Sequence, residues 1–363
     1  MRNINTGRFL VLATLAVFCA CDAYAGIVYV SAMSGSDTNN GSSWTMAKET
    51  IQAGVDAAAR NDTVLVTNGT YNTGGHIPPG QVLCQTRVVI DKEVSVISVN
   101  GPSNTFIAGQ GPRNENAVRC VWMTSNTVLS GFTLTNGNAA GGAGGDDENG
   151  GGIFAQGESS IVSNCIITSC RASIGGGALG CTLNNCTLSG NSADNEGGGA
   201  IDSKLNNCTL LGNSATNYGG GAYFSTLNNC TITGNSAALR GGGTAGGILN
   251  NCTLSGNSAG ALGGGGSAGG ILNNCTLSGN SANFGGGAFN GTMNNCTLSG
   301  NSGGGAYNGT LNNCTAYGNT NGGLTMLTAR NTISFGNTEY EMTTVSAAFC
   351  YSNDPQFVDA AAG

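Results

Sequence analysis

The feature that most constrains the fold is a repeat of about 22 residues in the second half of the chain. Leu183 begins LNNCTLSGNSADNEGGGAIDSK, Leu205 begins LNNCTLLGNSATNYGGGAYFST, and Leu227 begins LNNCTITGNSAALRGGGTAGGI. Further copies begin at Leu249, Leu272, Met293 and Leu311, and degenerate copies begin at Leu129 and Ile161. This period is far longer than that of a helix or a strand, so each copy is one supersecondary unit that stacks on its neighbours.

Within a copy, the segment C-T-L-S is short, contains threonine and alternates in polarity, which is typical of a strand. The segments G-N-S-A and G-G-G are typical of turns. No copy contains a periodic segment of helix length. The repeat therefore predicts an all-β fold, a parallel β-helix solenoid in which every repeat position forms a column with a spacing of about 4.8 Å.

The columns predict what fills and stabilises the core. The first Leu or Met of each copy, the cysteine, and the Leu or Ile two residues later are expected to point inward. A column of asparagines is expected to stack its side-chain amides, as in cross-β assemblies. These asparagines are Asn191, Asn213, Asn235, Asn257, Asn280, Asn301 and Asn319.

The cysteines form a column of their own. Stacked side chains point the same way, which is poor geometry for disulfides, and no C-x-x-C pair suggests zinc. We therefore expect small buried thiols, with Cys170 and Cys181 as the one candidate disulfide. The column contains Cys165, Cys186, Cys208, Cys230, Cys252, Cys275, Cys296 and Cys314.

Residues 1–25 have the pattern of a signal peptide. Arg2 and Arg8 precede an apolar stretch that is too short to span a bilayer, and an Ala-Tyr-Ala segment ends at Ala25. A lipoprotein signal with Cys21 as the lipidated residue is the alternative. We expect a secreted or cell-surface protein without a transmembrane segment in its mature part.

Residues 26–110 contain more valine and fewer glycines than the repeats, and we expect them to form an N-terminal cap and the first coils. The segment 50–59 predicts a short helix with Ile51, Val55 and Ala58 on one face. Such a helix would cover the open end of the solenoid. Residues 111–363 are expected to form the β-helix repeats, the most regular of them in 161–329.

The charge of the chain excludes one class of partner. The formal net charge is −7, the pI is about 4.6, and the 12 Lys and Arg residues are scattered. A nucleic-acid partner needs a basic surface, and the sequence offers none. An anionic polysaccharide needs only a local basic spot, so a polysaccharide or a cell-surface partner is compatible with the sequence.

The opening segments YVSAMSGSDTNNGSSW and TIQAGVDAAARNDTVLVTNGTY resemble those of secreted bacterial right-handed parallel β-helix proteins of the pectate-lyase-like superfamily. The NCTLSGNSA and GGGA segments also resemble the repeats of polymorphic outer membrane proteins. The resemblance covers nearly the whole mature chain and implies a right-handed solenoid. Polysaccharide lyases of this fold typically use carboxylate-bound Ca²⁺ and a basic residue.

The first candidate site is a metal site. Asp146, Asp147 and Glu148 are adjacent in a glycine-rich insertion, and three acids with carbonyl-rich neighbours are suitable ligands for Ca²⁺. A solvated loop is the alternative. His76, the one histidine of the chain, lies outside the repeats with no partner for catalysis implied, so we expect a structural role.

The second candidate site is a column of side chains, each directly before a glycine run. Its members are Ile174, Glu196, Tyr218, Arg240, Leu262 and Phe284, and the acidic and basic residues close to it in sequence are Asp194, Asp202 and Lys204. Glu196 and Arg240 would lie two coils apart, roughly 10 Å, with Tyr218 between them. A carboxylate, an aromatic ring and a guanidinium in a row could hold a sugar chain. Ordinary variation at a surface turn is the alternative.

Two functions are compatible with this sequence. The uniform coils favour a non-catalytic secreted or surface β-helix, adhesin-like or structural, that binds carbohydrate. The alternative is a carbohydrate-active enzyme, a polysaccharide lyase or glycoside hydrolase, that acts on an acidic polysaccharide. Glu196 and Arg240 are its candidate catalytic residues, whereas Tyr218, Asp194, Asp202, Lys204 and Phe284 are candidates for binding carbohydrate.

Overall fold

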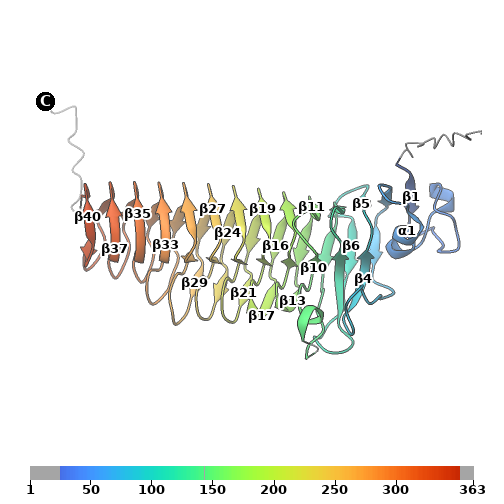
Figure 1. The fold of residues 1–363 in the computed structure, drawn as a ribbon, viewed down its shortest axis with the longest axis horizontal. Helices are drawn as coiled ribbons and strands as arrows, with labels where there is room; N and C mark the ends of the chain where they lie inside the picture. Colours follow the sequence, from blue (N-terminus) through green and yellow to red (C-terminus); the bar gives the residue numbers. More distant parts are fainter. Residues whose placement is uncertain (1–24, 143, 352–363) are drawn as a thin grey trace, which may run out of the picture.

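The chain forms a long parallel β-helix whose coils stack along one axis (Figure 1). The computed structural model describes residues 25–142 and 144–351, so residues 1–24 of the predicted signal peptide lie outside the described residues. The expected all-β parallel solenoid is confirmed. In the described part of the chain, no helix is long and apolar enough to cross a membrane.

Three parallel sheets run along the solenoid, with 23, 12 and 5 strands in the described residues. The largest sheet contains β1 (Ile27–Val30), β2 (Thr63–Val66), β4 (Gln85–Ile90), β5 (Ser95–Ser98), β7 (Val118–Met123), β8 (Val128–Ser130), β10 (Ile153–Ala155), β11 (Ile161–Ser163), β14 (Ala178–Leu179), β15 (Thr182–Asn184), β18 (Ala200–Ile201), β19 (Lys204–Asn206), β22 (Ala222–Tyr223), β23 (Thr226–Asn228), β26 (Thr244–Ala245), β27 (Ile248–Asn250), β30 (Ser267–Ala268), β31 (Ile271–Asn273), β33 (Ala288–Asn294), β35 (Ala306–Asn312), β37 (Leu324–Arg330), β39 (Met342–Thr343) and β40 (Ser346–Ala348). The second sheet contains β3 (Gly69–Tyr71), β6 (Thr105–Ala108), β9 (Thr133–Thr135), β12 (Ile166–Thr168), β16 (Thr187–Ser189), β20 (Thr209–Leu211), β24 (Thr231–Thr233), β28 (Thr253–Ser255), β32 (Thr276–Ser278), β34 (Thr297–Ser299), β36 (Thr315–Tyr317) and β38 (Ile333–Phe335). The third sheet contains β13 (Arg171–Ile174), β17 (Ser192–Glu196), β21 (Ser214–Ala215), β25 (Ser236–Ala237) and β29 (Ser258–Ala259).

The register between coils keeps equivalent repeat positions together. Leu183 pairs with Leu205, Leu205 pairs with Leu227, and Leu188 pairs with Leu210. All of these leucines are fully buried. The predicted inward columns of leucines and cysteines are therefore confirmed, and together they form one continuous core.

The predicted asparagine ladder is present and buried. Asn213 donates its side-chain Nδ2 to Oδ1 of Asn235 (2.9 Å) and to the backbone oxygen of Leu188 (2.9 Å), and its backbone N–H also donates to Oδ1 of Asn235 (2.9 Å). The pattern repeats from coil to coil and ends at Asn337, whose Nδ2 donates to a carboxylate oxygen of Glu341. The ladder therefore satisfies buried polar groups that a solenoid turn would otherwise leave unpaired.

The cysteine column consists of buried thiols. The backbone N–H of Cys186 donates to Sγ of Cys208 (3.4 Å), and that of Cys208 donates to Sγ of Cys230 (3.4 Å). A hydrogen bond with the neighbouring Cys186 thiol and then burial raise the pKa of Cys208 to about 12, so this thiol stays protonated at neutral pH. The predicted disulfide between Cys170 and Cys181 is wrong, because both are free buried thiols facing the core.

The N-terminal end carries the predicted helix, α1 (Ile51–Ala57) (Figure 1). Thr50 caps it by accepting a hydrogen bond from the backbone N–H of Ala53 (3.1 Å). Ile51 and Val55 are buried as expected. Gly54 allows close packing, because a Cβ at this position would come within 2.5 Å of a methyl carbon of Val30.

Two short 3₁₀ helices complete the described elements. They are η1 (Trp44–Met46) and η2 (Gly145–Glu148). The second contains the acidic triplet that the sequence suggested as a metal site, so its surroundings decide what those carboxylates do.

Candidate functional site

The column of residues before the glycine runs has the predicted register over most of its length. The backbone of Glu196 forms a parallel β-bridge with Tyr218, and Tyr218 forms one with Arg240. Phe284 also belongs to the column, because its carbonyl accepts a hydrogen bond from Gly264 just as the Arg240 carbonyl does from Gly219.

Leu262 was placed in this column wrongly. Its coil has one extra residue and four glycines, so the residue that bridges Arg240 is Gly263. Leu262 instead donates its backbone N–H to the carbonyl of Leu239, the residue before Arg240. The extra glycine leaves no side chain between Arg240 and Phe284 in this column.

A second column of side chains, which the sequence analysis missed, lies two residues after each glycine run on the outer face of the largest sheet. Its consecutive members are Leu179, Ile201, Tyr223, Ala245, Ala268, Phe289 and Tyr307. The preceding residues, such as Ala222 and Ala288, are buried, and strand alternation therefore directs this column outward. The sequence does indicate this column, because the second residue after the glycine run is alanine in some copies and aromatic in others.

The two columns enclose a groove of about 430 Å³, which we call the aromatic groove. It is lined by Tyr218, Tyr223, Phe224, Arg240, Ala245, Gly246, Ala268, Gly269, Gly270, Phe289 and Asn290. Aromatic residues stand at both ends, and alanines and glycines form the floor between them. Three coil steps separate Tyr223 from Phe289, roughly 14 Å along the axis.

The aromatic residues at each end of the groove contact one another. The rings of Tyr218 and Tyr223 are stacked, with centroids 5.9 Å apart, and the Tyr223 ring meets Phe224 edge-on at 4.4 Å. At the other end, Phe289 stacks on Tyr307 at 5.7 Å. Such contacts fix the rings, so both ends of the groove offer preorganised apolar surfaces.

Phe224 occupies an unusual backbone conformation. Its φ of 43° is left-handed, a region that glycine, Asn and Asp usually occupy, and its side chain is 59% exposed. Equivalent positions in neighbouring coils are Asp202 and Gly246, also with positive φ. The coil therefore has a positive φ at this position, and Phe224 adopts it at some cost in stability while its ring stays exposed beside the groove.

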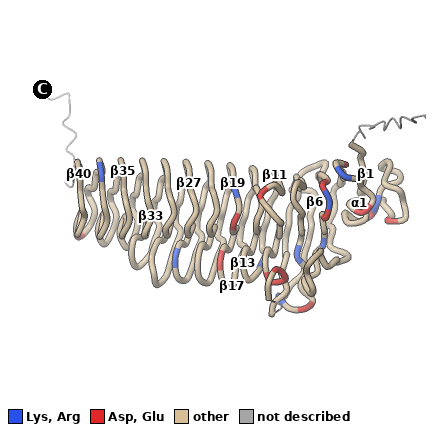
Figure 2. Tube along the Cα trace, viewed as in Figure 1, with Lys and Arg blue, Asp and Glu red and all other residues tan. Residues whose placement is uncertain are grey.

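Arg240 supplies the charge of the groove. No charged residue occurs between Arg240 and Arg330 in the sequence, and Figure 2 shows charged positions gathered toward the N-terminal part of the solenoid. The Arg240 guanidinium carbon lies 5.2 Å from the centroid of the Phe289 ring, a cation–π contact. Its Nε is buried and has no hydrogen-bond partner among the described residues. Nη1 and Nη2 also have no partner among the described residues and keep some accessible surface, so the groove contains unused hydrogen-bond donors on a cation.

Glu196 and Asp202 form an acidic pair beside the Tyr218 and Tyr223 end of the groove. Burial raises the pKa of Glu196, and the charge of Asp202 raises it further. Burial also raises the pKa of Asp202. The pKa of Tyr223 is raised by burial first and then by the charge of Glu196, which places the pair close to the aromatic ring.

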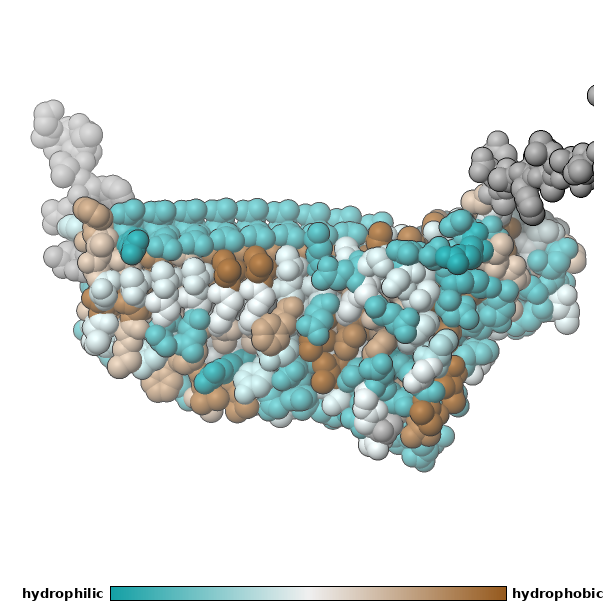
Figure 3. All heavy atoms as spheres, in the orientation of Figure 1, coloured by the Kyte–Doolittle hydropathy of each residue, from teal (hydrophilic) through white to brown (hydrophobic). Residues whose placement is uncertain are grey.

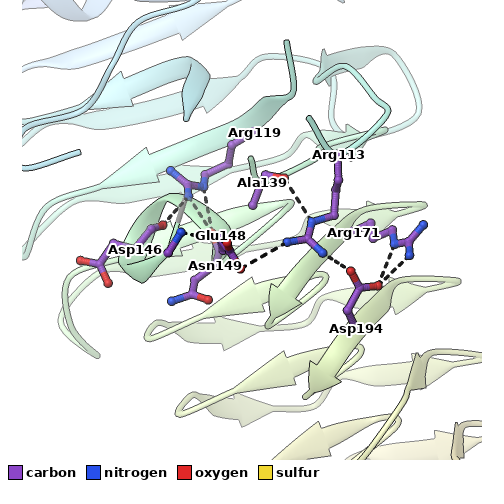
Figure 4. Close-up of polar contacts among 9 residues, drawn as sticks. Arg113, Arg119, Ala139, Asp146, Glu148, Asn149, Arg171 and Asp194 are labelled. Atoms are coloured by element: carbon purple, nitrogen blue, oxygen red, sulfur yellow. Dashed lines mark hydrogen bonds and ion pairs between the residues drawn. The ribbon is translucent and has the colours of Figure 1, made fainter. Parts of the chain in front are cut away.

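The structure places three other predicted residues outside the lining of the groove: Phe284, Lys204 and Asp194. Lys204 lies on an exposed column of the largest sheet between Thr182 and Thr226. Asp194 forms ion pairs with Arg113 and with Arg171, and its Oδ1 lies 2.7 Å from Nη2 of Arg171 (Figure 4). Asp194 therefore links an early loop to the third sheet.

The acidic triplet does not converge on one point. The buried carboxylate of Asp147 accepts hydrogen bonds from the backbone N–H groups of residues 82–84, the shortest from Cys84 (2.9 Å). Glu148 accepts from the backbone N–H of Gly144 (2.8 Å) and lies 3.8 Å from Arg113. Among the described residues, no three His, Cys, Asp or Glu side chains gather in a way that could hold a metal ion.

A buried arginine binds the backbone of this insertion. Arg119 is fully buried and donates to the backbone oxygens of Asp146 (3.0 Å), Asn149 (2.6 Å) and Gly150 (2.8 Å) (Figure 4). Its guanidinium also lies over the Phe154 ring at 5.2 Å. Asp146 and Asp147 lie close enough for their charges to favour this cation, whereas Glu148 lies beside Arg113. These contacts give the triplet a structural role in fastening the insertion to the solenoid.

The outer surface is otherwise regular and polar. Figure 3 shows straight hydrophilic rows along one edge of the solenoid. Two asparagines per coil supply such rows, and their side chains are linked across coils, as between Asn206 and Asn184 (2.8 Å) and between Asn251 and Asn229 (3.3 Å). The aromatic groove therefore interrupts an otherwise repetitive surface.

The fold and this groove define a parallel β-helix protein with one irregular, aromatic face. No family model and no curated protein match the sequence. The structure is similar to the A-module of the mannuronan C-5 epimerase AlgE4 from Azotobacter vinelandii, with 15% identity, 82% of this chain and 91% of that chain covered, and a TM-score of 0.42.

Two further solved structures are similar at the same level. The PL6 family alginate lyase AlyGC has 11% identity, with 89% of this chain and 50% of that chain covered and a TM-score of 0.48. The GH136 lacto-N-biosidase from Eubacterium ramulus has 11% identity, with 91% and 67% covered and a TM-score of 0.41. Similarity at these identities concerns the fold alone.

Proposed function

We propose that this protein is an exported β-helix that binds carbohydrate in the aromatic groove without cleaving it. The observation that supports this proposal is the combination of preorganised aromatic rings at both ends of the groove with the Arg240 guanidinium between them, which has no partner among the described residues. Sugar rings present an apolar face that packs on aromatic rings and hydroxyl groups that accept hydrogen bonds. A small number of polar groups in a mostly apolar cleft is the usual composition of a ligand site.

The dimensions of the groove suggest the length of ligand. The floor between Tyr223 and Phe289 consists of Ala245 and Ala268 and spans roughly 14 Å. An open groove of this length would hold a short stretch of a polymer, not a single buried ring. Because Arg240 is the one cation of the lining, we expect a polymer that carries carboxylate or sulfate groups to bind more tightly than a neutral one.

The test is binding of residues 26–363 to a panel of neutral and acidic polysaccharides, by affinity electrophoresis and then calorimetry with oligosaccharides. Tyr223→Ala and Phe289→Ala are each expected to weaken binding about tenfold, since each removes an aromatic contact surface. Arg240→Gln should weaken binding of acidic polymers more than that of neutral ones.

A matched control is available on another face. Tyr317 stacks on Phe335 at 5.4 Å on the second sheet, outside the groove, so Tyr317→Ala removes an exposed aromatic ring without touching the proposed site. This variant should bind like the wild type. Equal loss of binding in Tyr317→Ala and Tyr223→Ala, or no binding across the panel, would contradict the proposal.

One observation favours the enzymatic alternative. Glu196 and Asp202 interact beside the aromatic groove, and the pKa of each is raised. Glycoside hydrolases use two carboxyl groups, one protonated and one ionised. Release of new reducing ends that is abolished by Glu196→Gln and by Asp202→Asn would establish a hydrolase in place of a binding protein. Binding that is retained in both variants without cleavage supports our proposal.

A further inference from the structure

A second cavity lies at the N-terminal end of the solenoid, apart from the aromatic groove. It has a volume of about 210 Å³ and lies between the start of α1, strand β3 and the loop 72–76 that follows it. Its lining consists of Ala32, Glu49, Thr50, Ile51, Gln52, Thr70, Tyr71, Asn72, Thr73, Gly74, His76, Arg87 and Val88. None of these residues lines the aromatic groove.

Arg87 is the residue that requires explanation. Its side chain is part of the cavity lining but only 6% exposed. Its Nε donates to the backbone oxygen of Ala108 (2.8 Å), and its Nη1 donates to that of Gly74. Nη2 has no hydrogen-bond partner among the described residues. Unlike Nε of Arg240, it is not buried and keeps some accessible surface.

The charge of Arg87 is also unpaired within the described residues. The ion pairs found there involve Arg60, Arg113 and Arg171, and none involves Arg87. Glu49 lines the same cavity but is exposed and forms no ion pair with Arg87. Burial lowers the pKa of Arg87, which shows that its environment disfavours the cation. A buried charge without a partner is costly, and proteins usually compensate it with a counter-charge.

Arg119 is also buried in this part of the fold, but its hydrogen bonding differs from that of Arg87. All of its guanidinium nitrogens donate hydrogen bonds, and the acidic residues Asp146 and Asp147 lie close enough to raise its pKa against the effect of burial. The protein therefore supplies partners and negative charge where an arginine serves only structure. At Arg87, whose side chain lines a cavity, it supplies two carbonyl oxygens and leaves Nη2 without a partner among the described residues.

We propose that this cavity binds a small oxyanion, a phosphate, a sulfate or the carboxylate of a single acidic sugar, through Nη2 of Arg87. Arginine is well suited to such groups because its donors match the spacing of their oxygens. Thr70, Asn72, Thr73 and His76 surround the cavity with hydrogen-bonding side chains. The volume is below the 300 Å³ or so of typical drug-sized ligand sites, which suits a single small group.

The chain contains one histidine, so the ring signal of His76 in an untagged protein reports on this cavity alone. The experiment titrates ¹⁵N-labelled protein at constant pH with phosphate, sulfate, glucuronate or, as a control, chloride, and follows the His76 ring resonances by NMR. We expect saturable shifts with at least one oxyanion and none with chloride. The oxyanion that saturates at the lowest concentration distinguishes inorganic anions from a sugar carboxylate.

Arg87→Gln should weaken binding at least tenfold, whereas Arg60→Gln should leave it unchanged, because Arg60 is exposed and paired with Glu93 (2.7 Å) outside the cavity. If Arg87→Gln fails to fold, Asn72→Asp serves instead. Asn72 is exposed at the cavity, so an added negative charge should weaken anion binding several-fold without affecting the fold. Absence of any saturable shift, or unchanged binding in these variants, would overturn the proposal.

Discussion

Replacing Asn235 by alanine tests whether the asparagine ladder stabilises the solenoid. Asn235 is fully buried, and its Nδ2 donates to the backbone oxygens of Leu210 (3.0 Å) and Thr233 (3.1 Å) and to Oδ1 of Asn257 (3.0 Å). Its Oδ1 accepts from the backbone N–H and from Nδ2 of Asn213, both at 2.9 Å. Alanine therefore removes the Oδ1 acceptor from two donors of Asn213, its backbone N–H and its Nδ2, and both donors are buried.

The expected loss follows from these contacts. Each buried donor that is left unsatisfied costs about 1–3 kcal/mol, so two of them predict a loss of roughly 4 kcal/mol in the free energy of unfolding. The loss should be concentrated in the coils next to Asn235, because each coil of a solenoid contacts mainly its neighbours. Urea denaturation followed by circular dichroism measures the total, and hydrogen exchange locates it.

Asn229→Gly is the matched control. Asn229 lies in the neighbouring exposed column with a φ of 54°, which glycine adopts without strain, and its side-chain oxygen accepts one surface hydrogen bond from Asn251 (3.3 Å). We expect this variant to lose less than about 1 kcal/mol. A loss in Asn235→Ala that is no larger than in Asn229→Gly would refute the view that the buried ladder contributes to stability.

Two further predictions concern the insertion and the thiol column. Asp147→Asn should weaken the hydrogen bonds from residues 82–84 and destabilise this contact by about 2–3 kcal/mol, which faster amide exchange of Cys84 would reveal; unchanged exchange would contradict it. The pKa of Cys208, Cys230 and Cys252 is raised to about 12 from an ordinary value of 9.0, so stability should be complete below pH 9 and fall as pH rises towards 12, because the unfolded thiols ionise first. Denaturant midpoints measured between pH 8 and 11 test this, and a midpoint that does not change with pH would show that thiol burial is not linked to stability.

The repeated columns could be predicted from the sequence because each repeat position has one environment. The period places Asn213 above Asn235 and Leu205 above Leu227, and the structure confirms both. Helix α1 could also be predicted, since Ile51 and Val55 are one turn apart on a short apolar face. Local pattern and packing agree at these positions.

The site was predicted only in part. The column of Glu196, Tyr218 and Arg240 follows directly from the repeat. Leu262 was misplaced because its coil has four glycines, and the sequence does not show which of them is the extra residue. The binding partners of Asp147 lie more than 60 residues away in sequence, at residues 82–84, in a segment outside the repeats. Contacts of that kind leave no periodic signal. The outward column that contains Tyr223 can be recognised in the sequence, but only by comparing which coils have small residues and which have aromatic residues at the same repeat position.

The coils differ in length without losing register. The residues linked along the ladder are separated by 22 positions from Asn213 to Asn235, by 23 from Asn257 to Asn280, and by 18 from Asn301 to Asn319, yet the hydrogen bonds stay within 0.1 Å of one another. The differences are absorbed in turns on one side of the axis, where the third sheet ends at β29. Because each coil contacts mainly its neighbours, whole coils are interchangeable units of this ladder. Gain or loss of a whole coil would move the aromatic groove along the rod, or lengthen its floor, while every internal contact of the remaining coils is preserved.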